Sequence, residues 1–124
     1  MSDEIDIKAT LQAYCDCMLE SSAEKANTAF HSNAKVTGHI GSTLHEMTAE
    51  AFVALVASQQ PSPKEKGETL LFEVLSIETA GKTAVARVRD SYQGTTYLDT
   101  LSLIKDEGRW SIYTKLFHVE GTSS

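Results

Sequence analysis

One carboxylate of this chain, Asp99, lies in phase with a row of apolar residues. Asp99, Leu101 and Leu103 are spaced two apart in a strand-like segment. Side chains alternate between the two faces of a strand, so Asp99 faces the core if the leucines do. A charge that faces a core is costly unless it is paired or neutralised. Asp99 is therefore a candidate pocket acid that binds ligand oxygen or moves protons, and the alternative is a structural acid bonded to Tyr14 or a buried water.

Tight turns indicate which residues share the face of Asp99. Strands are expected over residues 68–79, 82–92, 95–105 and 109–119. A two-residue turn at Gln93-Gly94 places Asp90 opposite Tyr97, on the face of Asp99. One end of this face is apolar and the other collects acids and phenols, which is typical of a core that opens into a polar-lined pocket. Asp90 is a ligand-binding candidate, with a structural hydrogen bond to Tyr97 as the alternative.

The last hairpin decides where His118 points. A turn at Glu107-Gly108 pairs Tyr97 with His118 and Asp99 with Leu116, which puts His118 on the pocket face. A β-bulge in this hairpin would turn His118 to the other face, so both directions stay open.

The helices supply the other side of the pocket. A helix is expected over residues 4–20, with Tyr14 on its apolar face, where its hydroxyl contacts either a ligand or a structural partner. A short second helix follows, with Ser21 as its N-cap and Glu24 completing a capping box. A third helix begins at Thr48. The apolar wall of the pocket is expected to consist of Met18, Phe52 and Leu55.

Two histidines have a claim on the pocket as general acid or base, His39 in a short strand over residues 35–40 and His118. His31 ends the second helix as a dipole partner, and His45 lies in a polar loop. The histidines lack metal-ligand spacing and no cysteine joins them, so we expect no metal and no cofactor.

Composition excludes several classes of protein. The 124 residues predict one domain over 1–124. A net charge of −6 argues against nucleic acid and anionic membranes as partners. There is no run of about 18 apolar residues, and the acidic N-terminus does not resemble a signal peptide. A cytoplasmic location is the expectation.

The opposite face of the sheet is mixed, yet too apolar for open solvent. Its expected members are Phe72, Val74, Val85, Arg87, Arg89, Leu98, Thr100, Ser102, Tyr113, Lys115 and Phe117. A surface of this kind favours a homodimer formed through the outer sheet face.

The phrases "YCDCMLESSAEKANTAFHSNAKVTGHIG", "MTAEAFVALVAS", "AVARV" and "YLDTLSLIKDEGRWSIYTKLF" carry a family resemblance over most of the chain. The chain resembles the nuclear transport factor 2-like superfamily, in particular the small bacterial proteins labelled putative lumazine-binding. The resemblance implies an α+β, cystatin-like cone in which three N-terminal helices pack on a curved antiparallel sheet. It also implies a dimer with a pocket between helices and sheet.

The same superfamily contains ketosteroid isomerases and polyketide cyclases of the SnoaL type. By this resemblance Tyr14 falls where the isomerase has its oxyanion tyrosine, and Asp99 where it has a protonated aspartic acid. Gly38 falls where it has its general base. The resemblance therefore implies half a site, a tyrosine and an acid that bind a carbonyl or hydroxyl oxygen.

Three functions follow as hypotheses. The first is a dimeric protein that binds a planar or cyclic apolar molecule bearing an oxygen, with Tyr14, Tyr97 and Asp99 lining the pocket. The second is an isomerase, cyclase or dehydratase that uses Asp99, or Asp90 with His118, for proton transfer. The third is a structural or interaction module without catalysis.

Overall fold

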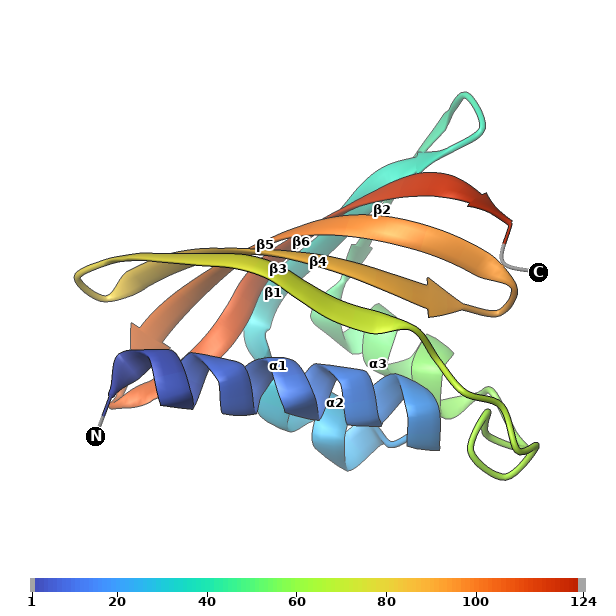
Figure 1. Ribbon diagram of the computed structural model, residues 1–124, viewed down its shortest axis with the longest axis horizontal. Helices are drawn as coiled ribbons and strands as arrows, with labels where there is room; N and C mark the ends of the chain where they lie inside the picture. The colour runs from blue at the N-terminus through green and yellow to red at the C-terminus, as the bar shows by residue number, and fades with distance from the viewer. Residues whose placement is uncertain (1, 123–124) are drawn as a thin grey trace.

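The computed structural model describes residues 2–122. The elements follow the chain in the order α1 (Asp3–Glu20), α2 (Ala23–Ala29), β1 (Phe30–Ile40), β2 (Thr43–Thr48), α3 (Ala49–Ala57), β3 (Phe72–Ala80), β4 (Thr83–Tyr92), β5 (Thr95–Asp106) and β6 (Arg109–Thr122). The three helices pack against one face of a curved sheet, which leaves its other face uncovered (Figure 1). The predicted α+β class and the helix count are confirmed.

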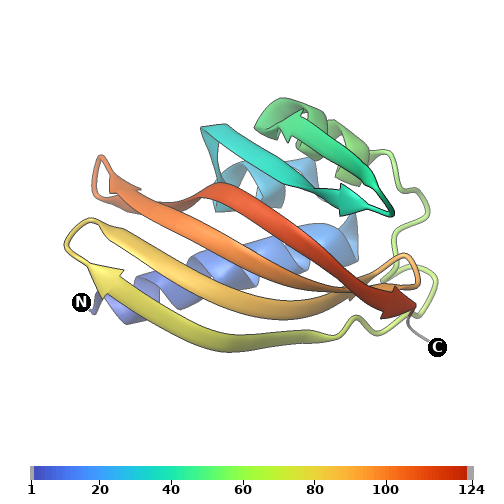
Figure 2. The same cartoon turned by 90° about the horizontal axis from the view of Figure 1, so that it is seen from above.

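The sheet has six strands in the order β2-β1-β6-β5-β4-β3. Antiparallel pairing joins β1 to β2 and each strand of the β3–β4–β5–β6 meander to the next, whereas β1 pairs parallel with β6 and so connects the N-terminal hairpin to the meander. Figure 2 shows this sheet from above, with α1 running beneath the meander. The long β1–β6 pairing brings residues far apart in the sequence to one wall of the cone.

The helix ends differ in one detail from the sequence prediction. Ser21, predicted as the N-cap of the second helix, instead closes α1 in a left-handed conformation with φ 51°, and its hydroxyl donates to the Gln59 carbonyl over 2.6 Å. Ser22 is the N-cap, accepting a hydrogen bond from the Lys25 amide. Thr48 caps α3 as predicted, through the Ala51 amide. Of the two adjacent serines, Ser21 therefore ends α1 in the αL conformation and Ser22 begins α2 as its N-cap.

The N-terminal hairpin is longer than predicted. β1 begins at Phe30, directly after α2, so His31 lies in a strand rather than at a helix end. Its imidazole Nε2 lies 3.1 Å from Asp106 Oδ2. His45 lies in β2, where a loop was predicted, because the glycine-containing turn after Ile40 reverses the chain into a second strand. Short polar strands such as β2 carry little hydrophobic periodicity, which is why the pattern missed it.

Hydrogen bonds anchor α1 to the sheet and so fix the position of the residues that α1 carries. The Thr10 hydroxyl donates to the Trp110 carbonyl oxygen over 3.0 Å, inside the core. At the N-terminal end of α1, the Trp110 indole N–H and the Lys105 ammonium both donate to Asp3 Oδ1, each over 3.1 Å. Together with burial of the apolar stripe of α1, these contacts hold the helix across β4, β5 and β6.

The hairpin registers confirm one prediction and correct another. In the β4–β5 hairpin Asp90 pairs with Tyr97 and Val88 with Asp99, as the Gln93-Gly94 turn predicts. In the β5–β6 hairpin the register shifts between Ser102 and Leu103, and Asp99 pairs with Phe117 instead of Leu116.

Tyr113 is the extra residue of this bulge, because Ile112 pairs with Leu103 and Thr114 with Ser102. From Thr114 to Val119 the side chains of β6 therefore face the opposite way from the turn-based prediction, until a second register shift, between Thr96 and Tyr97 of β5, restores the phase. Lys115 and Phe117, predicted on the outer face, lie on the inner face, and Leu116 and His118 lie on the outer face.

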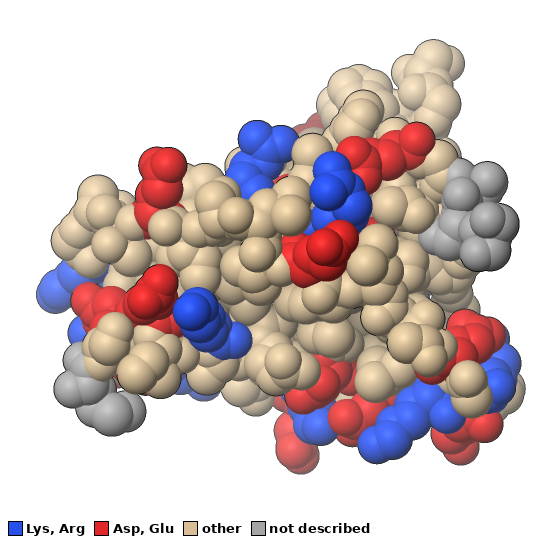
Figure 3. All heavy atoms as spheres, in the orientation of Figure 1, with Lys and Arg blue, Asp and Glu red and all other residues tan. Residues whose placement is uncertain are grey.

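The outer face, defined here as the uncovered face of the sheet, keeps several exposed apolar side chains. Leu44, Val85 and Leu116 are 51, 45 and 52% exposed. Phe72, predicted among them, instead pairs with Asp90 and packs edge-on against the Tyr14 ring inside the cone. Elsewhere on the surface, charged side chains of both signs are interspersed among uncharged ones (Figure 3).

Gly38 is required by the close approach of β1 to β6. A Cβ atom at Gly38 would overlap the Phe117 carbonyl oxygen and come within 2.6 Å of Cδ1 of the Phe117 ring. The Phe117 ring therefore fills the space into which a side chain at Gly38 would project. The structure therefore leaves no room for an acid at Gly38, the position that the sequence resemblance aligns with the isomerases' general base.

We expect the substitution Gly38→Ala to lower the free energy of unfolding by about 1–3 kcal/mol, because backbone and ring must both shift. Urea unfolding followed by circular dichroism measures this change. The control is His39→Ala, in the next residue of the same strand, whose exposed side chain faces outward. A loss no larger for Gly38→Ala than for His39→Ala would contradict the close contact.

Candidate functional site

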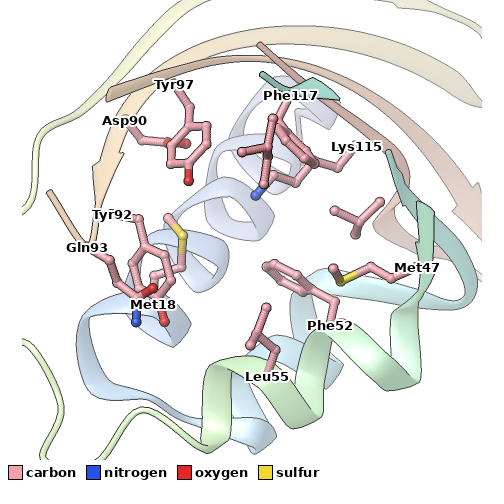
Figure 4. A pocket seen from close by; sticks show the side chains of 12 residues that line it. Met18, Met47, Phe52, Leu55, Asp90, Tyr92, Gln93, Tyr97, Lys115 and Phe117 are labelled. Carbon is pink, nitrogen blue, oxygen red and sulfur yellow. The ribbon is translucent and has the colours of Figure 1, made fainter. Parts of the chain in front are cut away.

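A pocket lies between α1, α3 and the inner face of the sheet, with lining residues from β1, β2, β4, β5 and β6. Its volume is about 200 Å³. It is hereafter called the inner pocket, and its lining residues are Met18, Val36, Ile40, Met47, Phe52, Leu55, Asp90, Tyr92, Gln93, Tyr97, Lys115 and Phe117. Figure 4 shows these side chains arranged around a common space, with Phe52 and Leu55 on the α3 side and Asp90 and Tyr97 on the sheet side.

The structure brings most of the sequence-predicted ligand-binding residues to this space. Met18, Phe52, Leu55, Asp90 and Tyr97 all line the inner pocket. Leu55 lies at the rim of the pocket, where its side chain is 45% exposed. The Tyr97 ring packs edge-on against Phe117.

Asp99 and Tyr14 do not line the pocket, but lie directly behind it in a buried polar cluster with Asp90. The Tyr14 hydroxyl donates to Asp99 Oδ2 over 2.8 Å and lies 3.3 Å from Asp90 Oδ2. All three side chains are at most 1% exposed. Asp99 therefore has the hydrogen bond to Tyr14 that a structural acid would have. It also lies next to Asp90, whose carboxyl group lines the pocket.

The two carboxyl groups, here called the carboxyl pair, share one proton. Burial, a hydrogen bond to Asp99 and repulsion from its charge raise the pKa of Asp90 to about 9, while Lys115 and Tyr14 oppose the shift. Of the two acids, Asp99 receives the shorter hydrogen bond from Tyr14, 2.8 Å against 3.3 Å for Asp90. At neutral pH Asp90 is the acid, and it hydrogen-bonds to the Asp99 carboxylate.

Lys115 brings a positive charge to the same cavity. Its side chain is 8% exposed, and its ammonium lies 5.0 Å from the centre of the Tyr14 ring and 4.8 Å from that of Phe52. It makes no hydrogen bond or ion pair with any residue between 2 and 122, although its charge acts on Asp90. In Figure 4 its nitrogen points into the inner pocket.

Two more polar atoms at this site have no hydrogen-bond partner among the described residues. They are the Tyr92 hydroxyl, whose residue lines the pocket, and Asp99 Oδ1. Proton sharing within the carboxyl pair gives Asp99 a partner. Burial raises the pKa of Tyr92 to about 12, so its hydroxyl stays neutral. A buried hydroxyl without a partner is costly, which indicates that water or a ligand completes it.

His39 and His118, the two histidines that the sequence placed as pocket candidates, lie elsewhere. They pair with each other across β1 and β6 on the outer face, and both are exposed. For His39 the strand alternation alone gives this direction. For His118 the bulge at Tyr113 decides the direction, and of the two directions that the sequence left open the outward one is confirmed.

Lys115 and Phe117 are pocket residues that the sequence reasoning missed. A strict period of two from the Glu107-Gly108 turn puts both on the outer face, and no residue type in β6 marks the bulge. The sequence shows only that Lys115 and Phe117 alternate with Leu116 and His118, so that one of these two pairs faces inward. The register of β6 against its neighbours decides which pair it is.

The inner pocket thus combines an apolar wall with groups that donate, accept and move protons. No cluster of three or more His, Cys, Asp or Glu side chains able to hold a metal ion occurs within residues 2–122. In the same part of the chain, no helix is long and apolar enough to cross a membrane. The protein's own side chains can polarise a carbonyl oxygen and exchange a proton with it.

Residues 2–118 match the model of a protein family described as "Putative lumazine-binding". An NTF2-like protein of unknown function from Silicibacter pomeroyi DSS-3 superposes with a TM-score of 0.85 at 21% identity, covering 97% of this chain and all of that one. Another, from Methylobacillus flagellatus KT, superposes with a TM-score of 0.83 at 25% identity, covering 98% and 95%.

A curated relative carries a name that refers to catalysis. The protein called aldolase FrzH, from Cladobotryum sp, is 25% identical over 118 residues, which are 94% of this chain and 92% of that protein. The structural matches confirm the NTF2-like fold that the sequence resemblance implied.

The proton on Asp90 makes folding depend on pH. The folded protein keeps it up to about pH 9, whereas the unfolded chain releases it near pH 4. The stabilisation is therefore complete below about pH 4, and it is lost as pH rises toward 9, by at most about 1.4 kcal/mol per pH unit. In Asp90→Asn we expect a shallower fall in the free energy of unfolding between about pH 5 and about pH 8. Urea unfolding of both proteins measures the slopes, and equal slopes would show that Asp90 is ionised.

Proposed function

We propose that this chain, which belongs to the "Putative lumazine-binding" family, binds a small uncharged molecule bearing a carbonyl or hydroxyl oxygen in the inner pocket. The ligand's apolar part packs on Phe52, Met18 and Leu55, and its oxygen faces the Lys115 ammonium and the Asp90 carboxyl group. The cyclic apolar ligand expected from the sequence fits this description.

The balance of charge at the site carries the proposal. The carboxyl pair shares one proton and so bears one negative charge, which the Lys115 ammonium balances. A charged ligand would disturb this balance in a poorly hydrated cavity and would cost free energy. A neutral oxygen, in contrast, accepts hydrogen bonds from Lys115, Asp90 or the unpartnered Tyr92 hydroxyl.

The size of the pocket limits the ligand further. About 200 Å³ is below the roughly 300–1,000 Å³ of pockets for drug-sized molecules. One ring or two fused small rings fit this space. The pteridine-like ring system in the family's name is of this class, although any compact cyclic ketone has the same features.

Binding can be tested with cyclohexanone, a neutral cyclic ketone, in a titration followed by two-dimensional NMR of the labelled protein. We expect the backbone signals of Phe52, Tyr92 and Lys115 to shift, and cyclohexanecarboxylate to bind about tenfold more weakly because of its charge. Asp99→Asn keeps the fold but removes the charge that balances Lys115. We expect this variant to lose most of the preference for the ketone over the carboxylate.

Tighter binding of the carboxylate to the unchanged protein, or ketone-induced shifts outside the pocket, would contradict this function. Ala13→Ser, a change on α1 away from the lining, serves as the control variant. Native mass spectrometry of protein purified from cells adds an independent view, because a retained natural ligand would be released on denaturation.

Catalysis at the same site is a second candidate function, favoured by one observation. A proton-transfer enzyme needs a second titratable group within reach of Asp99, and Asp90 is hydrogen-bonded to it while lining the pocket. The aldolase name of the Cladobotryum protein points to the same class of chemistry, proton transfer next to a carbonyl. In the NMR experiment in D₂O, this function predicts that the α-hydrogens of cyclohexanone exchange faster with protein than with buffer.

We further propose that the protein is a homodimer through its outer face. Leu116 and Val85 are about half exposed on this face, and a second copy of the same mixed surface would cover both. This assembly leaves the inner pocket free on the other side of the sheet. The module without catalysis or ligand remains the alternative if the pocket binds nothing.

We expect wild-type protein to sediment as a dimer, and Leu116→Asp to weaken dimerisation by at least about tenfold because it buries an unpaired charge. Analytical ultracentrifugation measures both. Ile5→Asp is the matched control, since Ile5 is an exposed apolar residue on α1. A wild-type monomer, or equal weakening by both substitutions, would contradict an interface on this face.

A further inference from the structure

We propose that the Lys115 amine is a covalent attachment point that forms an imine with aldehydes or ketones entering the inner pocket. This inference deepens the proposed function and rests on it. It assigns a nucleophile to a site where the sequence indicated acids, phenols and two histidines but no lysine.

The surroundings of Lys115 differ from those of other lysines of this chain. Lys25 and Lys105 donate to carboxylates of Glu20 and Asp3, over 2.7 and 3.1 Å, at the protein surface. The Lys115 ammonium instead lies over the faces of the Tyr14 and Phe52 rings and makes no salt bridge with any residue between 2 and 122, although its charge acts on Asp90. No ion pair with a carboxylate has to break before this amine reacts, and the rings restrict where its nitrogen lies.

The position of the nitrogen suits attack on a pocket ligand. The Lys115 side chain is buried against α1 and α3, while its end faces the cavity (Figure 4). A carbonyl compound held by the apolar wall therefore meets the amine in a fixed place. Such positioning is a large part of the advantage that enzymes give to bimolecular reactions.

Acid and base groups for the reaction are present in the same cluster. The charged and titratable groups that act on or contact Lys115 are Tyr14 and Cys17 from α1, Asp90 from β4, and Asp99 from β5 behind Asp90. Asp90 is the protonated member of the carboxyl pair, and it lines the cavity next to Lys115. It is therefore the group that can give a proton to the ligand oxygen and take one from the nitrogen.

The steps balance without any further reactant. The Lys115 ammonium first releases one proton to water. The lone pair of the resulting amine attacks the carbonyl carbon, a C–N bond forms, and the oxygen takes the Asp90 proton. The nitrogen then returns one proton to Asp90. Asp90 protonates the hydroxyl, the C–O bond breaks, and water leaves. The product is a protonated imine on Lys115, and Asp90 takes one proton back from water, so that the carboxyl pair again holds one proton.

Reductive trapping tests the proposal on the wild-type protein. The protein is incubated with cyclohexanone and sodium cyanoborohydride, which reduces an imine to a stable secondary amine, and the modified lysine is located by peptide mass spectrometry. We expect one cyclohexyl group on Lys115, added at least about tenfold faster than on any other lysine.

Two variants distinguish the role of the Lys115 amine as a nucleophile from the role of its positive charge. Lys115→Arg keeps the positive charge but cannot form an imine, so we expect it to lose this rapid trapping. Lys25→Arg, at an exposed lysine, should trap at the wild-type rate. Two-dimensional NMR checks that both variants keep the fold, and the wild-type peptide map is informative without any variant.

The outcomes distinguish this inference from the proposed function. Cyclohexanone binding in the inner pocket with trapping spread evenly over surface lysines would overturn the imine and leave the binding function standing. Absence of both binding and trapping would overturn both. Selective trapping on Lys115 supports the imine and the pocket together.

Discussion

Two carboxyl groups buried next to each other cannot both stay charged in a medium of low dielectric without a large cost in free energy. Asp90 and Asp99 avoid this cost by sharing a proton, with the Tyr14 hydroxyl on Asp99 and the Lys115 charge nearby. The arrangement works only while α1 lies across β4 and β5. The anchoring of α1 through Trp110 is therefore a condition for the chemistry of the site as well as for the stability of the core.

The same arrangement explains why the polar cluster lies at the boundary between core and cavity. One member of the carboxyl pair, Asp90, reaches the inner pocket, while Asp99 is enclosed behind it. A proton on Asp90 is thus available to a molecule in the pocket, and the Asp99 charge is shielded from solvent. A buried acid whose pKa is raised as that of Asp90 is, beside a second acid, is typical of sites that move protons beside a carbonyl group.

One strand, β6, determines what fills the cone next to the carboxyl pair. The Phe117 ring occupies the space beside Gly38, the position that the sequence resemblance aligns with the isomerases' general base. The amine of Lys115 enters the cavity two residues before Phe117, on the same strand. A single bulge in β6 is responsible for both features, since without it neither side chain would face inward.

Local patterns in the sequence were sufficient for the class of fold, the β4–β5 register and the burial of Tyr14, Asp90 and Asp99. Helix periodicity and a two-residue turn act over a few residues, so they can be read from the chain alone. The strand β2, the direction of His118 and the inward turn of Lys115 depended on the tertiary structure. They follow from the parallel pairing of β1 with β6 and from the bulge at Tyr113, and these are interactions between strands that no local pattern encodes.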